Sequence, residues 1–225
     1  MAIEIDFIKS IPYFSGLSPE ELESIRQLII EKKAERGEII IYEDDPADAL
    51  YFIHSGAAKV FKTSADGKEQ ILSIIRPGES FNDVPVLDNG TNPASVQAMG
   101  PVILNELKKS DMKDLLENYP QIAANTIKVL AEQVRELVTL VEDLSFRHVI
   151  GRVARILLQQ AGDGAIAGNG PRLTQQDMAA MAGTAREVVG RSLKTLEDEG
   201  AIRLERNRIV IIDKEALRDK VEVAL

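Results

Sequence analysis

An apolar heptad pattern in the second half of the chain constrains its fold more than any other feature. Steps of four and three residues alternate through Ala123, Ile127, Leu130, Val134, Leu137, Val141 and Leu144. A 3.5-residue repeat over about three heptads is typical of a coiled-coil seam, because it keeps one stripe of side chains facing a partner helix. The stripe could also pack on another part of the same chain, but its regularity favours a helix pair across a dimer. We therefore expect a dimerisation helix over residues 119–146, with positions 127–144 of the stripe at the interface.

Residues 34–108 carry a different pattern, in which short runs rich in β-branched residues alternate with turn residues. The runs are 39–42, 49–53, 59–62, 70–75, 94–98 and 102–104. Strands at this spacing are typical of a sandwich or jelly roll, and Asp66-Gly67 indicates a hairpin. Residues 1–30 are expected to be helical, and Ser18 with Glu21 predicts a capping box at a helix start. We expect a β-roll domain over residues 1–118.

The last third of the chain predicts a winged helix-turn-helix. Residues 147–160 continue as a helix, and a Gly/Ala-rich loop follows at 161–171. Residues 174–183 and 184–197 then form two helices with Gly183 in the turn between them, which is a helix-turn-helix arrangement. Thr184 can cap the second helix, and residues 204–210 predict a hairpin that serves as the wing. We assign residues 147–225 to this module.

Charge is distributed unevenly between these parts. Residues 1–146 hold 14 Lys and Arg against 25 Asp and Glu, whereas residues 147–225 hold 13 against 11. The second part is therefore better able to approach a polyanion such as DNA.

Composition argues against several classes of protein. The chain has no cysteine, which rules out disulfides, iron–sulfur clusters and Cys-ligated zinc, and we expect no metal site. No apolar run approaches ~20 residues, so no membrane span is expected. The acidic start does not resemble a signal peptide, so we expect a cytoplasmic protein. An enzyme is not expected, because the sequence contains no P-loop, HExxH motif or legible nucleophile–base pair.

The start of the second helix of the pair carries the residues best suited to read DNA. Arg186, Glu187, Gly190 and Arg191 lie at i, i+1, i+4 and i+5 and share one face. The first turns of a recognition helix meet base edges, where Arg can bind guanine O6 and N7 and Glu can accept from the cytosine amino group. Glu187 could instead form a capping box with Thr184, and both roles can hold. We favour base contact, because an acid between two arginines on one face is unusual for capping alone.

With a β-roll, a long helix and a winged helix-turn-helix in this order, the chain resembles the cAMP receptor protein/FNR family of bacterial transcription regulators. Residues 144–154 (LSFRHVIGRVA) are similar to the family's hinge, and residues 186–191 (REVVGR) to its recognition-helix signature R-E-x-x-G-R. The hinge would comprise Phe146, Arg147 and His148.

The resemblance implies an α+β fold with an N-terminal, cyclic-nucleotide-binding-like jelly roll, a long dimerisation helix and a C-terminal winged helix-turn-helix. It implies an effector-controlled homodimer that binds a palindromic TGTGA-like site in double-stranded DNA and works with RNA polymerase. In such a complex Arg186 and Arg191 would contact guanines, and Glu187 would contact the cytosine amino group.

Four further residues are candidates for phosphate contact, namely Thr174, Gln175, Arg206 and Arg208. Thr174 and Gln175 open the first helix of the pair, but Thr174 suits an N-cap with Asp177 equally well. Arg206 and Arg208 lie on the expected wing, where an ordinary solvated hairpin explains them as well as a DNA contact does.

Residues 81–94 correspond to the segment that holds a cyclic phosphate in the nucleotide-binding branch of the family. Asn82-Asp83 stand where that branch has Gly-Glu, and Asn92-Pro93 where it has an Arg and a hydroxyl neighbour. A phosphate needs an Arg fork or backbone amides, whereas Pro93 has no N–H and Asp83 would repel it. The effector-binding candidates are Phe81, Asn82, Asp83, Val84, Asn92, Pro93 and Ala94, with Gln133, Leu137 and Val138 on the long helix.

Cyclic AMP is therefore not expected as the effector, also because Leu137-Val138 stand where family members place Thr-Ser against adenine. The remaining effectors are a small organic acid, an apolar or aromatic ligand, or heme. Only His54 and His148 could offer heme an imidazole, although His54 is explained as a turn residue and His148 as a hinge contact. Heme-dependent nitric-oxide sensors of the family, such as the regulator of hybrid cluster protein (HcpR), have a similar layout without cysteine.

A second function is compatible with the fold. The chain could be a cyclic-nucleotide-type sensor that acts through protein partners rather than DNA. The signature at residues 186–191 argues against this alternative.

Overall fold

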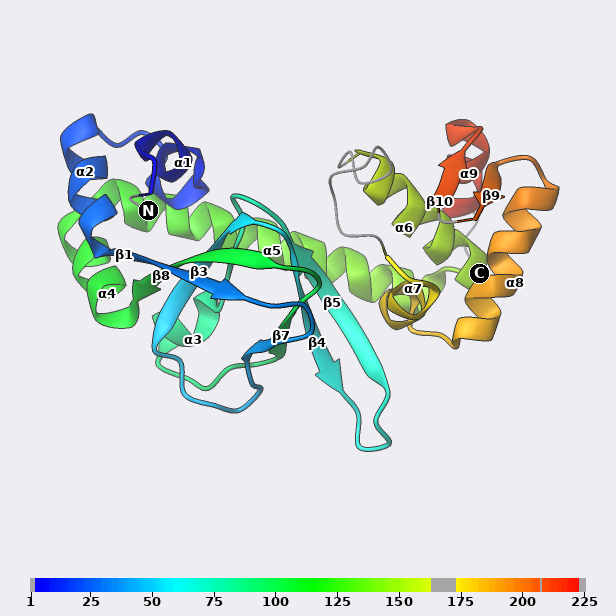
Figure 1. Ribbon diagram of the computed structural model, residues 1–225, viewed down its shortest axis with the longest axis horizontal. Coiled ribbons are helices and arrows are strands. Elements are labelled where there is room, and N and C mark those ends of the chain that lie inside the picture. Colours follow the sequence, from blue (N-terminus) through cyan, green and yellow to red (C-terminus); the bar gives the residue numbers. More distant parts are fainter. Residues whose placement is uncertain (1–2, 163–172, 207, 223–225) are drawn as a thin grey trace. The chain divides into compact units, whose positions relative to one another are not determined.

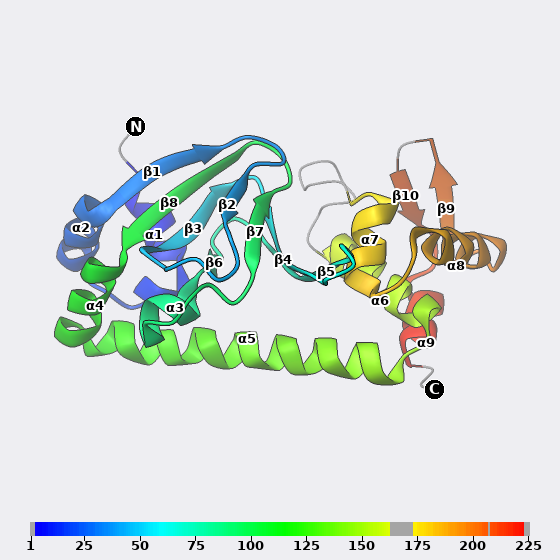
Figure 2. The same cartoon turned by 90° about the horizontal axis from the view of Figure 1, so that it is seen from below.

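The computed structural model describes residues 3–162, 173–206 and 208–222. Its contacts form two compact units. The first comprises Met1–Lys62 and Ser73–Glu136, and the second comprises Thr63–Leu72 and Leu137–Leu225. Figures 1 and 2 show the elements of both units from two directions. No helix among the described residues is both long and apolar enough to cross a membrane.

Two four-stranded sheets form the β-roll that the sequence predicts. One has the order β1-β8-β3-β6, with β1 (Ile29–Ala34), β8 (Val102–Lys108), β3 (Ala49–Ser55) and β6 (Ser80–Phe81). The other has the order β2-β7-β4-β5, with β2 (Ile39–Ile41), β7 (Ser95–Ala98), β4 (Ala58–Thr63) and β5 (Glu69–Ile75). Buried side chains from both sheets, including Ile53, Val96 and Leu104, share one core cluster.

Three elements of the roll differ from the prediction. β1 begins at Ile29, where a helix was expected to continue to residue 30, and the short β6 lies within no predicted strand. Residues Asp83–Asp88, expected as part of a loop, form the helix α3. The turn at Asp66-Gly67 connects β4 to β5 as expected, with Gly67 at a φ of +82°.

Short helices at the N-terminus form a second core with one face of the roll. They are α1 (Ile5–Ser10), η1 (Pro12–Phe14) and α2 (Pro19–Leu28), and α4 (Lys109–Asn118) follows β8. The capping box at the start of α2 is confirmed, since Glu21 N donates to Ser18 Oγ over 3.3 Å and Ser18 N donates to Glu21 Oε2 over 2.7 Å. Buried Tyr13 and Phe14 pack against Phe52 of β3.

The long helix α5 (Pro120–Phe146) runs through both units. In the first unit, its buried Asn125 donates from Nδ2 to the carbonyl oxygens of Tyr13 (3.0 Å) and Ser15 (2.8 Å). Most of the predicted heptad stripe is exposed: Ile127 is 68% exposed and Val134 58% in the first unit, and Val141 is 62% exposed in the second. Of the two interpretations of the stripe, packing within the same chain therefore loses support.

The second unit contains the helix-turn-helix and its wing, as expected from the sequence. Its elements are α6 (Val149–Gly162), α7 (Gln175–Ala182), α8 (Arg186–Asp198), β9 (Ile202–Glu205), β10 (Arg208–Ile211) and α9 (Lys214–Glu222). Antiparallel β9 and β10 form the wing hairpin. Val153, Met178 and Leu193 bury their side chains in a core shared by α6, α7 and α8. The predicted Gly/Ala-rich loop at 161–171 lies outside the described residues except for the end of α6.

Helices α6 and α9 pack with their backbones close together. A Cβ added at Gly151 of α6 would lie 2.7 Å from the carbonyl oxygen of Lys220 in α9. Glycine at this position is therefore what allows the two helices to approach so closely.

Candidate nucleic-acid interface

The turn between α7 and α8 is a tight one that depends on glycine. Gly183 has a φ of +60° and a ψ of +40°, the left-handed region that favours glycine. The amide of Thr184 donates to the carbonyl oxygen of Ala179 over 3.0 Å, which closes the end of α7. The expected cap on the next helix is wrong: Ala185 is the N-cap of α8 and no side chain caps it. The first turn of α8 therefore leaves the carboxylate of Glu187 uncommitted to capping.

The face of α8 predicted to read DNA is exposed along its first two turns. Arg186, Glu187 and Arg191 are exposed, whereas Val189 and Leu193 on the opposite side are buried. Within the part of the chain that the structure describes, none of these three charged side chains has an ion-pair or hydrogen-bond partner. The helix is thus held by its apolar face and presents two guanidinium groups and one carboxylate to solvent.

Residues at the start of α7 lie next to this face. A Cβ added at Gly190 would meet only the Oε1 atom of Gln175, at 3.8 Å, so the surface above Gly190 is open. Thr174 forms a capping box with Asp177: Asp177 N donates to Thr174 Oγ1 over 3.1 Å, and Thr174 N donates to Asp177 Oδ2 over 2.8 Å. The capping role of Thr174 is therefore confirmed, and its contact with phosphate stays a prediction.

The wing pairs two of its three arginines with one carboxylate. Glu205 lies 2.5 Å from Nε of Arg208 and 3.0 Å from Nη2 of Arg203. Hydrogen bonds from Arg208 first, and then from Arg203, lower the pKa of Glu205, so the carboxylate stays charged. Arg206, at the tip of the hairpin, is exposed. Arg208 thus has an internal counter-charge that the sequence pattern did not reveal.

The predicted effector segment places a buried carboxylate in a hydrogen-bond network. Asp83, only 5% exposed, accepts from the Tyr13 hydroxyl and from Ser80 Oγ (2.7 Å). Nε2 of Gln133 in α5 donates to Asp83 Oδ2 over 3.3 Å, so two residues predicted for this site do come together. Burial, followed by the charge of Asp83, raises the pKa of Tyr13 well above its ordinary range, so Tyr13 remains a donor.

Most other residues of the predicted effector segment 81–94 contact or are buried within the β-roll itself. Nδ2 of Asn82 donates to the Ala49 carbonyl oxygen over 2.9 Å, and Nδ2 of Asn92 donates to that of Tyr42 over 2.9 Å. The Pro93 carbonyl oxygen accepts from Lys62 over 3.1 Å. Phe81 is buried and stacks on Tyr51, Ala94 is buried, and Val84 is exposed. In the second unit, Leu137 and Val138 are exposed on α5.

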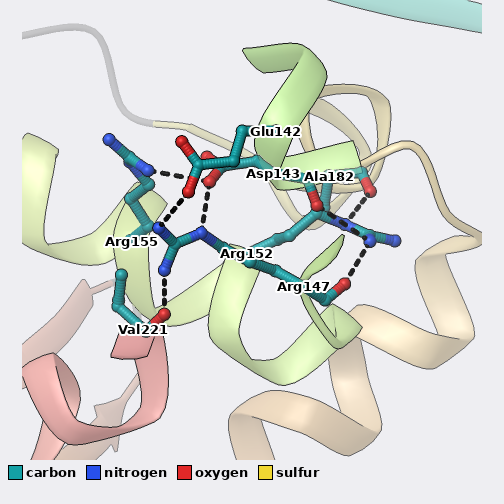
Figure 3. Close-up of polar contacts among 7 residues, drawn as sticks. All are labelled: Glu142, Asp143, Arg147, Arg152, Arg155, Ala182 and Val221. Carbon is teal, nitrogen blue, oxygen red and sulfur yellow. Dashed lines mark hydrogen bonds and ion pairs between the residues drawn. The ribbon is translucent and has the colours of Figure 1, made fainter. Parts of the chain in front are cut away.

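The predicted hinge contains a charge cluster that the sequence analysis missed (Figure 3). Oδ1 of Asp143, near the end of α5, lies 2.6 Å from Nε of Arg147 and 2.7 Å from Nη1 of Arg155 in α6. Arg147 also donates to the carbonyl oxygen of Val221 in α9. A pairing of Asp143 with Arg147, four residues on, was readable from the sequence, but the pairing with Arg155 requires the chain to turn between α5 and α6.

Neither histidine is set into a cluster of metal-ligating residues. His148 is exposed on the link between α5 and α6, and Phe146 beside it is exposed. His54 packs against the ring of Phe7, with centroids 4.5 Å apart. Among the described residues, no group of three or more His, Cys, Asp or Glu side chains could hold a metal ion.

Comparison with known proteins covers both units. Residues 31–119 match the family model described as the cyclic nucleotide-binding domain, and residues 151–220 match that of the Crp-like helix-turn-helix domain. The chain is 35% identical over 199 residues to the cyclic AMP receptor protein of Thermus thermophilus, which covers 88% of this chain and 90% of that protein. It is 31% identical over 209 residues to a CRP-like cAMP-activated global transcriptional regulator of Mycobacterium tuberculosis, and the match covers 91% of this chain and 93% of that protein.

A solved structure shows the same fold. FixK2 from Bradyrhizobium japonicum superimposes with a TM-score of 0.78 at 24% identity, over 88% of this chain and 99% of that chain.

Proposed function

Because the chain belongs to the cAMP receptor protein/FNR family of transcription regulators, we propose that it acts as an effector-controlled homodimer on a palindromic, TGTGA-like DNA site. The observation that carries this proposal is the exposed face of α8, where Arg186, Glu187 and Arg191 have no internal partner among the described residues. Charged side chains held on a rigid helix without counter-charges are available to base edges at little cost of reorganisation.

Each side chain on this face has a distinct role in the proposed complex. Arg186 and Arg191 bind guanines through their paired N–H donors, and Glu187 accepts from a cytosine amino group. Gly190 between them has no side chain, so the helix can approach the floor of the major groove closely. Thr174 and Gln175 at the start of α7, and Arg206 and Arg208 on the wing, contact phosphates and set the register.

Dimerisation is supported by the exposed apolar stripe of α5. Contiguous exposed aliphatic side chains of this kind mark an interface, because their burial against a second copy removes apolar surface from water. A two-fold pair would present its recognition helices about one DNA turn apart, roughly 34 Å, which matches a palindrome. Replacement of Val134 or Val141 by Asp should convert the dimer to monomer in sedimentation equilibrium. Lys128→Asp, at an exposed polar position of α5, should leave the dimer intact.

The effector we propose is a small ligand other than cyclic AMP, although the two relatives named above carry cAMP in their names. Asp83 uses both carboxylate oxygens inside the protein, and its negative charge opposes a phosphate. The side-chain amides of Asn82 and Asn92 are already bonded to backbone carbonyl groups. Residues 81–94 contain no arginine that could bind a phosphate.

Heme fits this chain less well than a small organic ligand does. The exposed His148 is the predicted iron ligand, whereas ligand pockets in proteins bury most of their ligand's surface. Absorption spectra during a heme titration test this: a Soret band that is lost in His148→Ala would favour heme. Native mass spectrometry of the purified protein would identify any ligand that it retains. Titration with cyclic AMP should leave the DNA affinity unchanged.

A band-shift experiment tests the DNA-binding function. The wild-type protein should bind a TGTGA palindrome far more tightly than a scrambled duplex at one stated salt concentration. Arg186→Ala or Arg191→Ala should each lose about 1–3 kcal/mol of discrimination at the base it contacts. Arg218→Ala removes the same charge from the exposed face of α9 and serves as the matched control. Equal affinity of the wild-type protein for both duplexes would refute the proposal.

A further inference from the structure

The C-terminal end of α5 is tied to the helix-turn-helix by three arginines. Asp143 forms ion pairs with Arg147 and Arg155, and Nη2 of Arg147 also lies 3.2 Å from Oε1 of Glu142. Arg152 of α6 donates from Nε to the carbonyl oxygen of Ala182, the last residue of α7, over 2.8 Å. Figure 3 shows Arg147 and Arg155 beside Asp143, and the carbonyl oxygens of Ala182 and Val221, which are far away in the sequence, beside Arg152 and Arg147.

The same arginines satisfy the free carbonyl groups where α5 ends. Nη1 of Arg152 donates to the carbonyl oxygens of Arg147 (2.6 Å) and Asp143 (3.4 Å), and Arg147 donates to that of Val221 in α9. A helix end normally leaves its last carbonyl groups to water or to capping groups. Here the end of α5 is bonded to Arg152 of α6, which also contacts α7, and Arg147 on the link between α5 and α6 contacts α9.

Burial makes Asp143 the centre of this arrangement. Its carboxylate belongs to a residue that is 9% exposed, and the two guanidinium groups share its Oδ1 atom. Without the carboxylate, the guanidinium groups of Arg147 and Arg155 would repel each other across a partly buried gap. Loss of this single charge therefore removes the ion pair of α5 with Arg155 of α6 and frees the guanidinium of Arg147, which is bonded to α9.

We infer that Asp143 is a positioning residue that fixes the dimer helix to the DNA-reading module and so sets the spacing of the two half-sites. This positioning role rests on the proposed function. Residues Leu137–Leu144 of α5 carry the last part of the dimer stripe and the carboxylate on the same short helical segment, which belongs to the same compact unit as α8. A rigid link between stripe and recognition helix gives the dimer one separation between its two recognition helices.

The consequence is a narrow preference for the length of the spacer between half-sites. One added base pair moves a half-site by about 3.4 Å along the axis and turns it by roughly a tenth of a helical turn. A rigid dimer cannot place both recognition helices on half-sites that are shifted and rotated in this way. A dimer with a loosened link can move its recognition helices to match them. A variant without the Asp143 charge should therefore bind palindromes of several spacer lengths with similar affinity.

The experiment measures dissociation constants of the full chain on a series of palindromes whose spacers differ by single base pairs. Asp143→Asn and, as a second variant, Arg155→Gln should reduce the ratio between the worst and best spacers by roughly 2- to 30-fold. Discrimination at each half-site base and the dimer in sedimentation equilibrium should be unchanged. Glu132→Gln removes a carboxylate charge from an exposed position of α5 outside this cluster and is the matched control.

Each outcome decides the inference. A flattened spacer profile in both variants, with a sharp profile in wild type and Glu132→Gln, supports the positioning role. An unchanged profile overturns it, as does a uniform loss of affinity at all spacers with a lowered melting temperature, since a general structural role would do that. A wild-type protein that prefers no palindrome over scrambled DNA would instead refute the proposed function and this inference with it.

Discussion

Asp83 offers a sharp test of how the effector segment is held, because its two obvious replacements should behave very differently. Asp83→Ala leaves the hydroxyl groups of Tyr13 and Ser80 without their acceptor, and both residues are buried. An unsatisfied buried donor costs about 1–3 kcal/mol, so the loss of folding free energy should be roughly 2–6 kcal/mol. That is a large share of the about 5–15 kcal/mol that stabilises a typical protein.

Asp83→Asn should cost far less than Asp83→Ala. The amide oxygen of asparagine can still accept from Tyr13 and Ser80, and Gln133 can turn its own oxygen toward the new amide group. The replacement also removes a buried charge for which the structure gives no cationic ion-pair partner among the described residues. We therefore expect a change within about 1 kcal/mol of wild type.

Urea denaturation followed by far-ultraviolet circular dichroism measures both changes, since the chain has no tryptophan to report by fluorescence. Asp114→Ala, at an exposed position of α4, is the control and should fall within about 0.5 kcal/mol of wild type. Equal losses in the alanine and asparagine variants would refute the reasoning, because the argument requires that the acceptor and not the charge stabilises the network.

Two further predictions concern the DNA-reading module. Gly151→Ala gains about 0.8–1 kcal/mol of helix propensity. The new Cβ forces the Lys220 backbone away, which typically costs about 1–3 kcal/mol. Thermal denaturation should therefore show net destabilisation, and a raised melting temperature would contradict the close contact between α6 and α9. The pKa of Glu197 is lowered first by the backbone N–H of Leu204 and then by Lys194. A lowered folded-state pKa contributes stability that is present above the ordinary value of 4.5 and is lost as the pH falls through the folded value. The melting temperature should therefore drop as the pH falls below the ordinary value of 4.5, and Glu197→Gln should reduce that drop. An identical drop in the variant would exclude the Glu197 contact as a cause.

Patterns within a short stretch of sequence predicted most of the fold. The heptad stripe, the capping box at Ser18 and the glycine turn at Gly183 each depend on residues a few positions apart, and each is present in the structure. Strand β1 was missed because it lies at the edge of its sheet and its middle residues are exposed, so Ile29–Ala34 show no alternation of apolar and polar residues. Its pairing with β8 joins residues more than sixty positions apart.

In the candidate site, too, contacts within one element were predictable and contacts between elements were not. The exposed face of α8 was readable because its residues share one helix. The contacts of Asp143 with Arg155, of Arg152 with Ala182 and of Glu205 with Arg208 depend on how separate elements fold back on one another. The cap expected from Thr184 was wrong because Ala185 occupies the N-cap position, which a pattern accurate to one residue cannot distinguish.

The N-terminal segment has a consequence for how this sequence can change over time. The Tyr13 hydroxyl donates to Asp83, the first residue of α3, and the Tyr13 carbonyl oxygen accepts from Asn125 of the long helix α5. One residue near the start of the chain therefore has partners on two helices. A replacement of Tyr13 or of Asp83 leaves the other side chain without this partner, whereas Asn125 bonds a backbone carbonyl that any residue at position 13 supplies. Among relatives we expect positions 13 and 83 to vary as a correlated pair, with the identity at one predictable from the identity at the other.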